Sequence, residues 1–167
     1  LIDIGFEKTS LGLFKNLALV HSITFPVGIN HIIKDISKVC SLSLEDSEII
    51  RNKIDFSFKK NEELFDENGY LKKIYFKNSS FRKISKSLIL DIVKARLDEI
   101  LGMVKKQTII MRLNSTFSAN LFIVGGGSNL SNLEKYCTSF FGSNTKKLRR
   151  NGKKESEYKL NENFISC

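Results

Sequence analysis

The chain has 167 residues, of which 41% are hydrophobic and 27% are charged, and 27 Lys and Arg against 18 Asp and Glu give a net charge of +9. This composition excludes wholesale disorder and a disulfide scaffold, and no apolar run approaches the roughly 20 residues of a transmembrane helix. Three cysteines without CxxC spacing argue against a structural zinc site. Because lysine is frequent along the whole chain, the positive charge indicates compositional drift, and we expect no nucleic-acid partner.

Three apolar runs at the start of the chain predict an antiparallel meander of β-strands. They are Leu1–Ile4, Thr9–Phe14 and Ala18–Phe25, and the links between them are short. The first run begins abruptly, with neither an initiator methionine nor the layout of a signal peptide. We therefore expect the chain to be a fragment of a longer protein.

After Pro26-Val27-Gly28 the apolar pattern changes to helical spacing and predicts two helices. Asn30 is available as the N-cap of the first helix, and Ser43 opens a capping box at the start of the second. The apolar residues at helical spacing are Ile32, Ile33, Ile36 and Val39 in the first helix and Ile49, Ile50 and Ile54 in the second.

The composition changes between Asp55 and Arg82, which we interpret as a small inserted lobe. Leu71, Ile74 and Phe76 predict a short strand within it. A long amphipathic helix from about Ser85 to Gln107 follows the lobe. Its apolar face comprises Ile89, Ile92, Val93, Leu97, Ile100, Leu101 and Val104.

The last third of the chain predicts one more strand and one more helix. A polar loop over residues 114–120 leads to the strand Leu121–Val124 and then to Gly125-Gly126-Gly127. Ser131 and Glu134 form a second capping box, which predicts a helix from about Ser131. The basic run that follows, residues 146–154, is typical of a solvated loop or a frayed edge, and binding of nucleic acid or anionic lipid is the alternative.

Two glycine-bearing turns follow apolar strands and are candidate phosphate or sugar contacts. Glycine lets a ligand approach the backbone closely, and such turns can aim several N–H groups at one point. The triplet Gly125-Gly126-Gly127 with Ser128 would also open a helix, whose dipole favours an anion. The alternative is a tight strand-to-helix connection. Asp3-Ile4-Gly5 is a weaker signal, because aspartates that end strands are common turn residues.

Four segments of the sequence together indicate a protein family more specifically than any one of them alone. They are Leu1–Gly5 with Thr9, Pro26–Gly28 with Asp35-Ile36 after it, Leu44–Arg51, and Phe122–Ser128 with Leu130 and Leu133 after it. In this combination the chain resembles the C-terminal half of the FtsA family of bacterial cell-division proteins, a branch of the actin-like ATPase superfamily. The resemblance implies an α/β fold of the actin-like, ribonuclease-H-like type, with a mixed sheet built on the N-terminal meander. It implies a core subdomain of residues 1–54 and 83–167 and an inserted lobe of residues 55–82.

The resemblance also implies a site for ATP with Mg²⁺. Asp3, Gly5 and Thr9 fall on the second phosphate motif of the superfamily, where the aspartate orients the metal through its water shell. Glu48 and Arg51 fall on a helix that reaches the ribose and the adenine. The adenosine motif corresponds to Gly125, Gly126, Gly127 and Ser128. No catalytic residue is expected in this chain, and any ATPase activity of the longer protein would be slow.

The turn after Gly5 departs from the family pattern. Where many relatives place two glycines and a threonine, this chain has Phe6, Glu7 and Lys8. Glu7 would repel an anion unless a metal or Lys8 offsets its charge. Adenine contact is therefore the firmer expectation. The pilus-assembly protein PilM tolerates a carboxylate in this turn, so a PilM-like adaptor is the main alternative, followed by a fragment of a sugar kinase.

Partners follow from the same resemblance. Arg96 and Glu99 match helix positions that bind the C-terminal tail of FtsZ, the tubulin-like partner; the alternative for this pair is an exposed ion pair between residues i and i+3. Self-association into actin-like filaments is implied as well. The expected location is the cytoplasm, at the inner face of the membrane at the division site, with attachment through a helix that this chain lacks.

Overall fold

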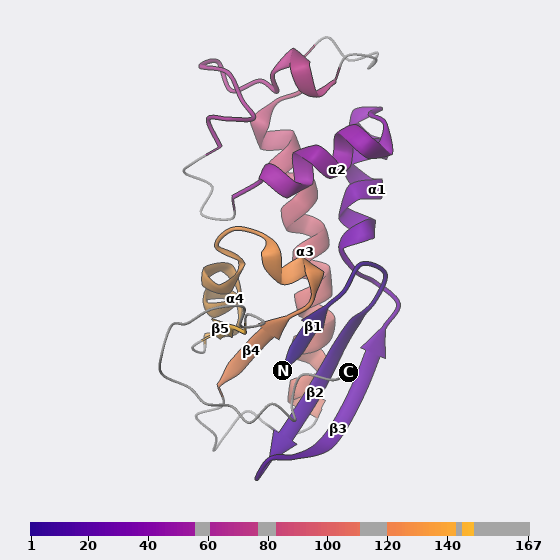
Figure 1. Ribbon diagram of the computed structural model, residues 1–167, viewed down its shortest axis with the longest axis vertical. Helices are drawn as coiled ribbons and strands as arrows, with labels where there is room; N and C mark the ends of the chain where they lie inside the picture. The colour runs from indigo at the N-terminus through magenta and orange to yellow at the C-terminus, as the bar shows by residue number, and fades with distance from the viewer. Residues whose placement is uncertain (56–60, 77–82, 111–119, 143–144, 149–167) are drawn as a thin grey trace, which may run out of the picture.

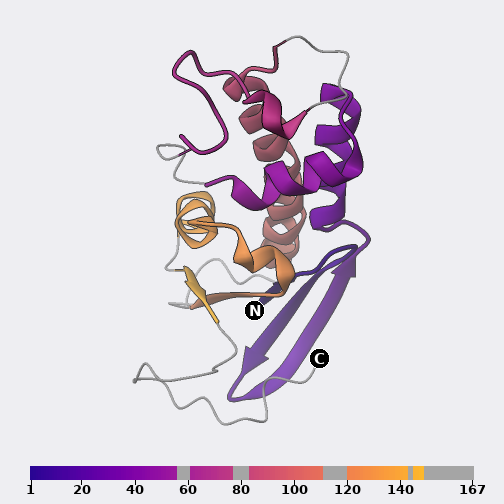
Figure 2. The same ribbon diagram turned by 45° about the horizontal axis from the view of Figure 1, so that its top comes forward.

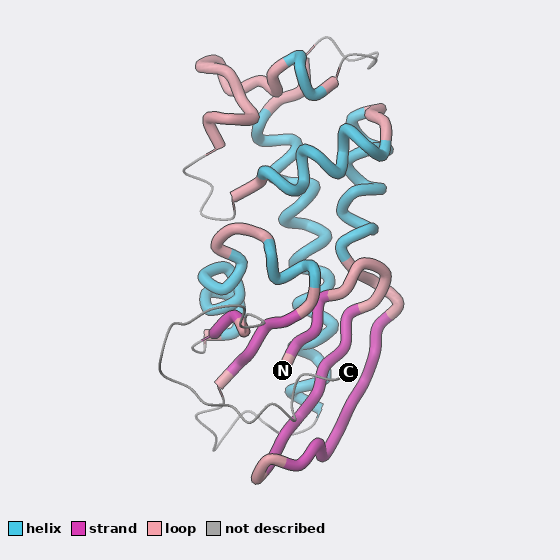
Figure 3. The backbone as a smooth tube through the Cα atoms, in the orientation of Figure 1, coloured by secondary structure: helices cyan, strands magenta, loops and turns pink. Residues whose placement is uncertain are grey.

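A five-stranded mixed sheet with helices packed on it forms the framework of the chain (Figure 1). The computed structural model describes residues 1–55, 61–76, 83–110, 120–142 and 145–148. The strands lie side by side in the order β3-β2-β1-β4-β5 (Figure 3). Their bounds are β1 Ile2–Ile4, β2 Thr9–Lys15, β3 Ala18–Phe25, β4 Leu121–Val124 and β5 Thr145–Lys147.

The predicted N-terminal meander is confirmed. β1 pairs with β2 and β2 pairs with β3, both antiparallel, with Ile4 opposite Thr9. Side chains alternate between the faces of a strand, and Ile2, Ile4 and Leu11 are accordingly buried. β3 is the edge strand, and Leu19 and Val20 on it are more than half exposed.

β4 joins the sheet beside β1, although more than a hundred residues separate them in the chain. It pairs parallel with β1, with Ile2 opposite Ile123 and Asp3 opposite Val124. A parallel neighbour requires a long crossover, and here the helices between β3 and β4 supply it. β5 pairs parallel with β4, so the first two residues of the predicted basic run, Lys146 and Lys147, lie in an edge strand that the sequence did not indicate. The rest of the predicted basic run, from residue 149 onward, lies outside the described residues.

The first two predicted helices are present as α1 (Ile29–Cys40) and α2 (Leu44–Lys53). Ser43 caps α2 as expected, since its hydroxyl accepts from the Asp46 amide at 3.0 Å. The predicted apolar faces are partly wrong. Val39 and Ile49 were expected on these faces, but their side chains are 46% and 45% exposed. The buried apolar residues are Ile29, Ile32, Ile33, Ile36 and Cys40 in α1, Ile50 in α2, and Ile54 directly after α2.

The long helix α3 (Lys86–Ile110) confirms the strongest helical pattern of the sequence. It runs behind the sheet and reaches the inserted segment (Figures 1 and 2). The hydroxyl of Tyr136 donates to Asp98 of α3 from α4 (Leu133–Phe141), and burial together with that carboxylate raises the pKa of Tyr136. The buried face of α3 comprises Ile89, Val93, Leu97, Ile100, Leu101 and Val104, with Ile92 partly buried.

The strand predicted around Leu71–Phe76 is wrong. A short 3-10 helix, η1 (Lys73–Tyr75), occupies these residues, and Leu71 makes only an isolated bridge with Phe65. Ile74 is 65% exposed, because no sheet lies beside it. The described residues of the inserted segment lie at the end of the molecule remote from the sheet (Figure 2). The boundaries of a separate lobe stay a prediction.

The predicted capping box at Ser131 and Glu134 is also wrong. α4 begins at Leu133, and its N-cap is Asn132 in the left-handed conformation with φ of 61°, without a side-chain cap. The side chain of Asn132 points elsewhere, since its amide donates to the carboxylate of Asp55 at 2.8 Å. None of the helices in the described part of the chain has the length and hydrophobicity of a membrane span.

The first turn of α1 is docked on the turn between β1 and β2. The amides of Ile29 and Asn30 donate to the carbonyls of Gly5 at 3.1 Å and Phe6 at 2.8 Å. These two groups belong to the four N–H groups that a helix N-terminus leaves unpaired. Gly28 is therefore the N-cap, and Asn30 is not, because its side chain donates to Glu7 instead.

We expect Gly28→Ala to destabilise the protein. A Cβ at this position would lie 2.6 Å from the carbonyl oxygens of both Gly5 and Phe6, so the helix would have to move off the turn. Overpacking of this kind costs about 1–3 kcal/mol. Urea unfolding measures the loss. Gly102→Ala on α3, where nothing lies within 4 Å, is the matched control and should be neutral or stabilising. Equal stability of the two variants would contradict the docking.

Candidate functional site: two glycine bends at the edge of the sheet

The two bends that the sequence singled out are in direct contact. Because β1 and β4 are parallel, their carboxyl ends meet at one edge of the sheet. A Cβ on Gly125 would lie 2.2 Å from the Asp3 carboxylate and 2.6 Å from the Ile4 carbonyl oxygen. Gly125 also has φ of +85°, in the region that favours glycine. The structure therefore brings Asp3, Gly5 and the glycine triplet together.

The other two glycines of the triplet face different surroundings. A Cβ on Gly127 would lie 2.5 Å from Ile4 Cγ2 and 2.8 Å from Ile29 Cγ1, so the packed isoleucines leave no room for a side chain at this position. Gly126 is exposed, and nothing lies within 4 Å of the place where its Cβ would be. Bare backbone is thus presented outward at Gly125 and Gly126, and a flat ligand could approach it closely.

The glycine triplet does not open an α-helix as predicted. It leads into a single 3-10 turn, η2 (Gly126–Asn129), and α4 starts only at Leu133. The buried Ser128 closes this turn, since its hydroxyl donates to the Gly125 carbonyl at 2.7 Å. A four-residue turn has no substantial dipole, so the expected dipole contribution to anion binding is absent here.

Thr9 shapes the first bend from inside the protein. It is fully buried, and its hydroxyl donates to the Val27 carbonyl at 2.8 Å. Gly5 closes the bend itself, because its amide donates to the Lys8 carbonyl at 2.9 Å. The hydroxyl of Thr9 therefore holds the segment before α1 against the hairpin and is not directed at a ligand.

Asp3 is the acidic group at the junction of the two bends. Within the described residues its carboxylate has no hydrogen-bond partner, although it lies beside Gly125. No group of three or more His, Cys, Asp or Glu side chains that could hold a metal is found in the described ranges. A single carboxylate fits Mg²⁺ that arrives with phosphate groups and keeps several waters, the usual arrangement for this ion.

Glu48 and Arg51 lie one turn apart on α2 in contrasting environments. Glu48 is exposed, whereas Arg51 is only 9% exposed. Burial lowers the pKa of Arg51, and Glu48 acts in the opposite direction. The Nε atom of Arg51 is buried without a hydrogen-bond partner in the described structure. Such a donor costs about 1–3 kcal/mol unless an acceptor reaches it.

The C-terminal end of α2 is fastened to the segment that follows the glycine triplet. Asp55 bridges to Ser131 in parallel register and accepts from the Asn132 amide at 2.8 and 3.0 Å. These contacts connect the helix of Glu48 and Arg51 to the chain after η2. No local pattern in the sequence identifies this pair, because its members are 77 positions apart.

Arg96 and Glu99 belong to the contact between α1 and α3. Arg96 donates from Nε and a terminal nitrogen to both carboxylate oxygens of Asp35 on α1, at 2.6 and 3.0 Å. Its other terminal nitrogen donates to Glu99 at 2.6 Å. The hydrogen bonds to Asp35 are the main cause of the raised pKa of Arg96. The alternative of an ion pair between residues i and i+3 is thus present, and Asp35 extends it.

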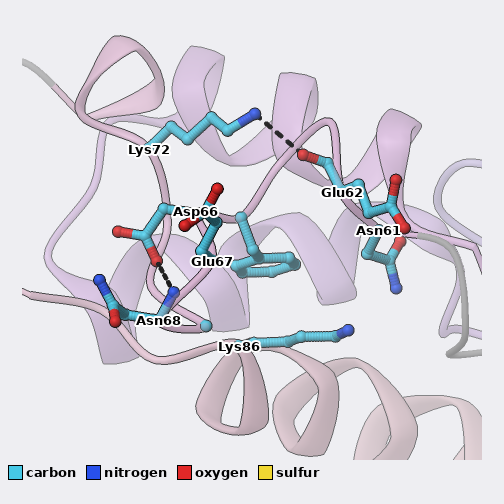
Figure 4. A pocket seen from close by; sticks show the side chains of 9 residues that line it. Asn61, Glu62, Asp66, Glu67, Asn68, Lys72 and Lys86 are labelled. Carbon is cyan, nitrogen blue, oxygen red and sulfur yellow. Dashed lines mark hydrogen bonds between the residues drawn. The ribbon is translucent and has the colours of Figure 1, made fainter.

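A hollow of about 710 Å³ lies in the inserted segment rather than at the bends (Figure 4). Phe65 forms part of its lining, with the ammonium of Lys86 5.9 Å from the ring centroid, and Lys72 donates to the Glu62 carbonyl at its rim. The sequence had not indicated this hollow. Its lining residues are Asn61, Glu62, Phe65, Asp66, Glu67, Asn68, Gly69, Lys72 and Lys86.

Comparison with solved structures identifies the fold. MreB5 of Spiroplasma citri bound to AMPPNP superposes with a TM-score of 0.63 at 22% identity, over 87% of this chain and 46% of that one. A chain of the PilM-PilN type IV pilus biogenesis complex gives a TM-score of 0.60 at 18% identity, over 88% and 34%. The ethanolamine utilization protein EutJ from Carboxydothermus hydrogenoformans gives 0.58 at 16%, over 87% and 42%. The predicted actin-like mixed α/β fold is thereby confirmed.

Comparison with sequence families identifies the relatives. The family model described as "Cell division protein FtsA" matches residues 1–163. The cell division protein FtsA of Neisseria meningitidis serogroup B is 26% identical over 144 residues, which are 84% of this chain and 33% of that protein. The chain thus spans about a third of the length of this curated relative. With its actin-like fold and a family match along nearly its whole length, the chain belongs to the FtsA family of cell-division proteins.

Proposed function

We propose that this chain is the ATP-binding and partner-binding part of an FtsA-like protein, which links FtsZ filaments to the cytoplasmic membrane at the division site. The contact between the bend at Asp3 and the bend at Gly125 carries the proposal, because the family resemblance assigns both to one nucleotide. Family membership supports the role in cell division. Solved structures of MreB5 with AMPPNP and with ADP support a nucleotide in this fold.

The adenosine would lie against the bare backbone of Gly125 and Gly126. Gly127 would support that surface by packing on Ile4. Glu48 and Arg51 would reach the ribose and the adenine from α2. Arg51 fits such a role, because its buried Nε lacks an acceptor that a ligand could supply.

The phosphates would face the bend between β1 and β2, which the bond from the Gly5 amide to the Lys8 carbonyl closes. Asp3 would hold Mg²⁺ through the metal's water shell, and bound Mg²⁺ with ATP would supply a conformational and polymerisation switch. Thr9 and Ser128 would keep the two bends in shape through their hydrogen bonds to backbone carbonyls. The proposal assigns no catalytic residue to this chain.

The C-terminal tail of FtsZ would bind at Arg96 and Glu99 on α3. An acidic group of the tail would compete with Asp35 for the guanidinium of Arg96. Self-association into filaments and attachment to the membrane complete the proposed role. A PilM-like adaptor, which would bind a short peptide of a different membrane partner, is the second candidate because of the structural similarity to PilM.

We expect Gly126→Asp to abolish nucleotide binding without unfolding the protein. The position is exposed with nothing within 4 Å, so the new side chain fits, but it adds a negative charge where a nucleotide would lie. Juxtaposed like charges cost several kcal/mol, and the affinity for an ATP analogue with Mg²⁺ should fall by about 100-fold or more. Titration calorimetry on the full-length protein measures the loss.

Gly102→Asp on α3 is the matched control, because it adds the same charge at an equally open glycine away from the bends. It should bind the analogue like the unmodified protein. Equal affinity of the Gly126→Asp variant and the control would remove the nucleotide proposal.

The tail contact is tested by two variants that break the same bridge. Arg96→Ala removes the cation that the tail would bind, whereas Asp35→Asn weakens the bridge but keeps the cation. If Arg96 binds the tail, its removal should lower the affinity for a peptide of the FtsZ C-terminus by about 10- to 100-fold, because hydrogen bonds to charged groups contribute about 1.5–3 kcal/mol. Asp35→Asn should keep the affinity or raise it. Fluorescence anisotropy gives both values.

Loss of peptide binding in both variants would mean that the bridge acts only by positioning α1 on α3. Lys86→Ala at the hollow of the inserted segment should lower the affinity for the FtsZ peptide if that segment contacts the tail, and should leave it unchanged if it does not. A protein that ignores the FtsZ peptide and binds a peptide of a pilus partner would favour the PilM-like function.

A further inference from the structure

Glu7 is held in place at the tip of the turn between β1 and β2. The side-chain amide of Asn30 donates to Glu7 Oε1, and the backbone amide of the same Asn30 donates to the Phe6 carbonyl. The turn itself is closed by the bond from the Gly5 amide to the Lys8 carbonyl. An exposed glutamate normally samples many rotamers, and this one is restrained by α1.

The groups that would attract an anion at this turn are already used. The first amides of α1 donate to the carbonyls of Gly5 and Phe6, and the Gly28 amide donates to His31 Nδ1 at 3.2 Å. The helix N-terminus, a common anion site, therefore faces carbonyl oxygens. Asp3 adds a second negative charge beside the turn, and Lys8 is the one cation within it.

Glu7 belongs to the turn that the proposed site assigns to the phosphates. Its Cα is three residues from that of Ile4, so the two lie within about 11 Å of each other. The carbonyl oxygen of Ile4 in turn lies 2.6 Å from the place of a Cβ on Gly125. The separation between the Cα atoms of Glu7 and Ile4 is thus comparable with the Debye length of about 8–10 Å at moderate salt.

We infer that Glu7, fixed by Asn30, is a specificity-determining residue that selects against free polyphosphate and makes binding of a nucleoside triphosphate dependent on a divalent cation. The inference rests on the proposed nucleotide site. The two carboxylates of Asp3 and Glu7 oppose the charge of the phosphates, and a divalent cation offsets that repulsion. A ligand without phosphates, such as adenosine, is unaffected by Glu7.

The test compares the full-length protein with Glu7→Gln, which removes the charge and keeps an oxygen that can accept from Asn30. Titration calorimetry is done with a non-hydrolysable ATP analogue in EDTA, with the same analogue in Mg²⁺, and with adenosine. In EDTA the variant should bind the analogue about 3–10-fold more tightly than the unmodified protein, because a like charge within the Debye length is removed. In Mg²⁺ and with adenosine the two proteins should agree within about twofold, and the gain in EDTA should vanish near 1 M salt.

Glu67→Gln, an exposed glutamate of the inserted segment, is the matched control and should behave like the unmodified protein. Asn30→Ala releases Glu7 without removing its charge and should give a smaller gain in EDTA. Equal affinity of Glu7→Gln and the unmodified protein in EDTA would overturn the inference while leaving the nucleotide site intact. Failure of every ligand to bind, adenosine and the Mg²⁺ complex included, would overturn the proposed function itself.

Discussion

Parallel pairing of β1 with β4 is the constraint on which the rest of the structure depends. It places Asp3 opposite Val124, so the chain must turn away from both strands at the same edge of the sheet. The bend after β4 then passes so close to β1 that a Cβ on Gly125 would overlap the Asp3 carboxylate. The strand pairing therefore requires glycine at position 125. The same closeness creates a surface of bare backbone next to a carboxylate.

The helices hold that edge in position through polar contacts at their ends and sides. α1 anchors the first bend by donating its first amides to the carbonyls of Gly5 and Phe6. α3 is tied to α1 through Arg96 and Asp35 and to α4 through Asp98 and Tyr136. The helix that follows β3 and the helix that follows β4 are thus both attached to the same long helix. The relative placement of the two bends is therefore a property of the packed helices as well as of the sheet.

Local patterns predicted most of the elements but not their partners. The meander and the long helix are correct, because alternation and helical spacing over many residues reflect a buried face directly. The strand around Leu71 is wrong, because three apolar residues do not specify a neighbouring strand for them to pair with. Asn30 is a good N-cap by residue type, yet Gly28 takes that place because a close approach of two backbones required glycine there. The second capping box fails because Asn132 bonds to Asp55 across 77 positions.

The sequence by itself determined the actin-like resemblance, most of the elements and the glycine-bearing bends, because these depend on residue type and short-range spacing. Only the tertiary structure decided that the bends touch, that Thr9 and Ser128 support them from inside, and that Arg51 carries a buried Nε without an acceptor. It also decided that Asn30 restrains Glu7 and that Asp35 engages Arg96. The physical reason is the distance along the chain. Ser128 bonds to Gly125 only three positions away, but the other hydrogen bonds join residues from 18 to 61 positions apart, and the paired strands are more than a hundred positions apart. No local spacing encodes which of these distant groups meet once the sheet and helices are packed.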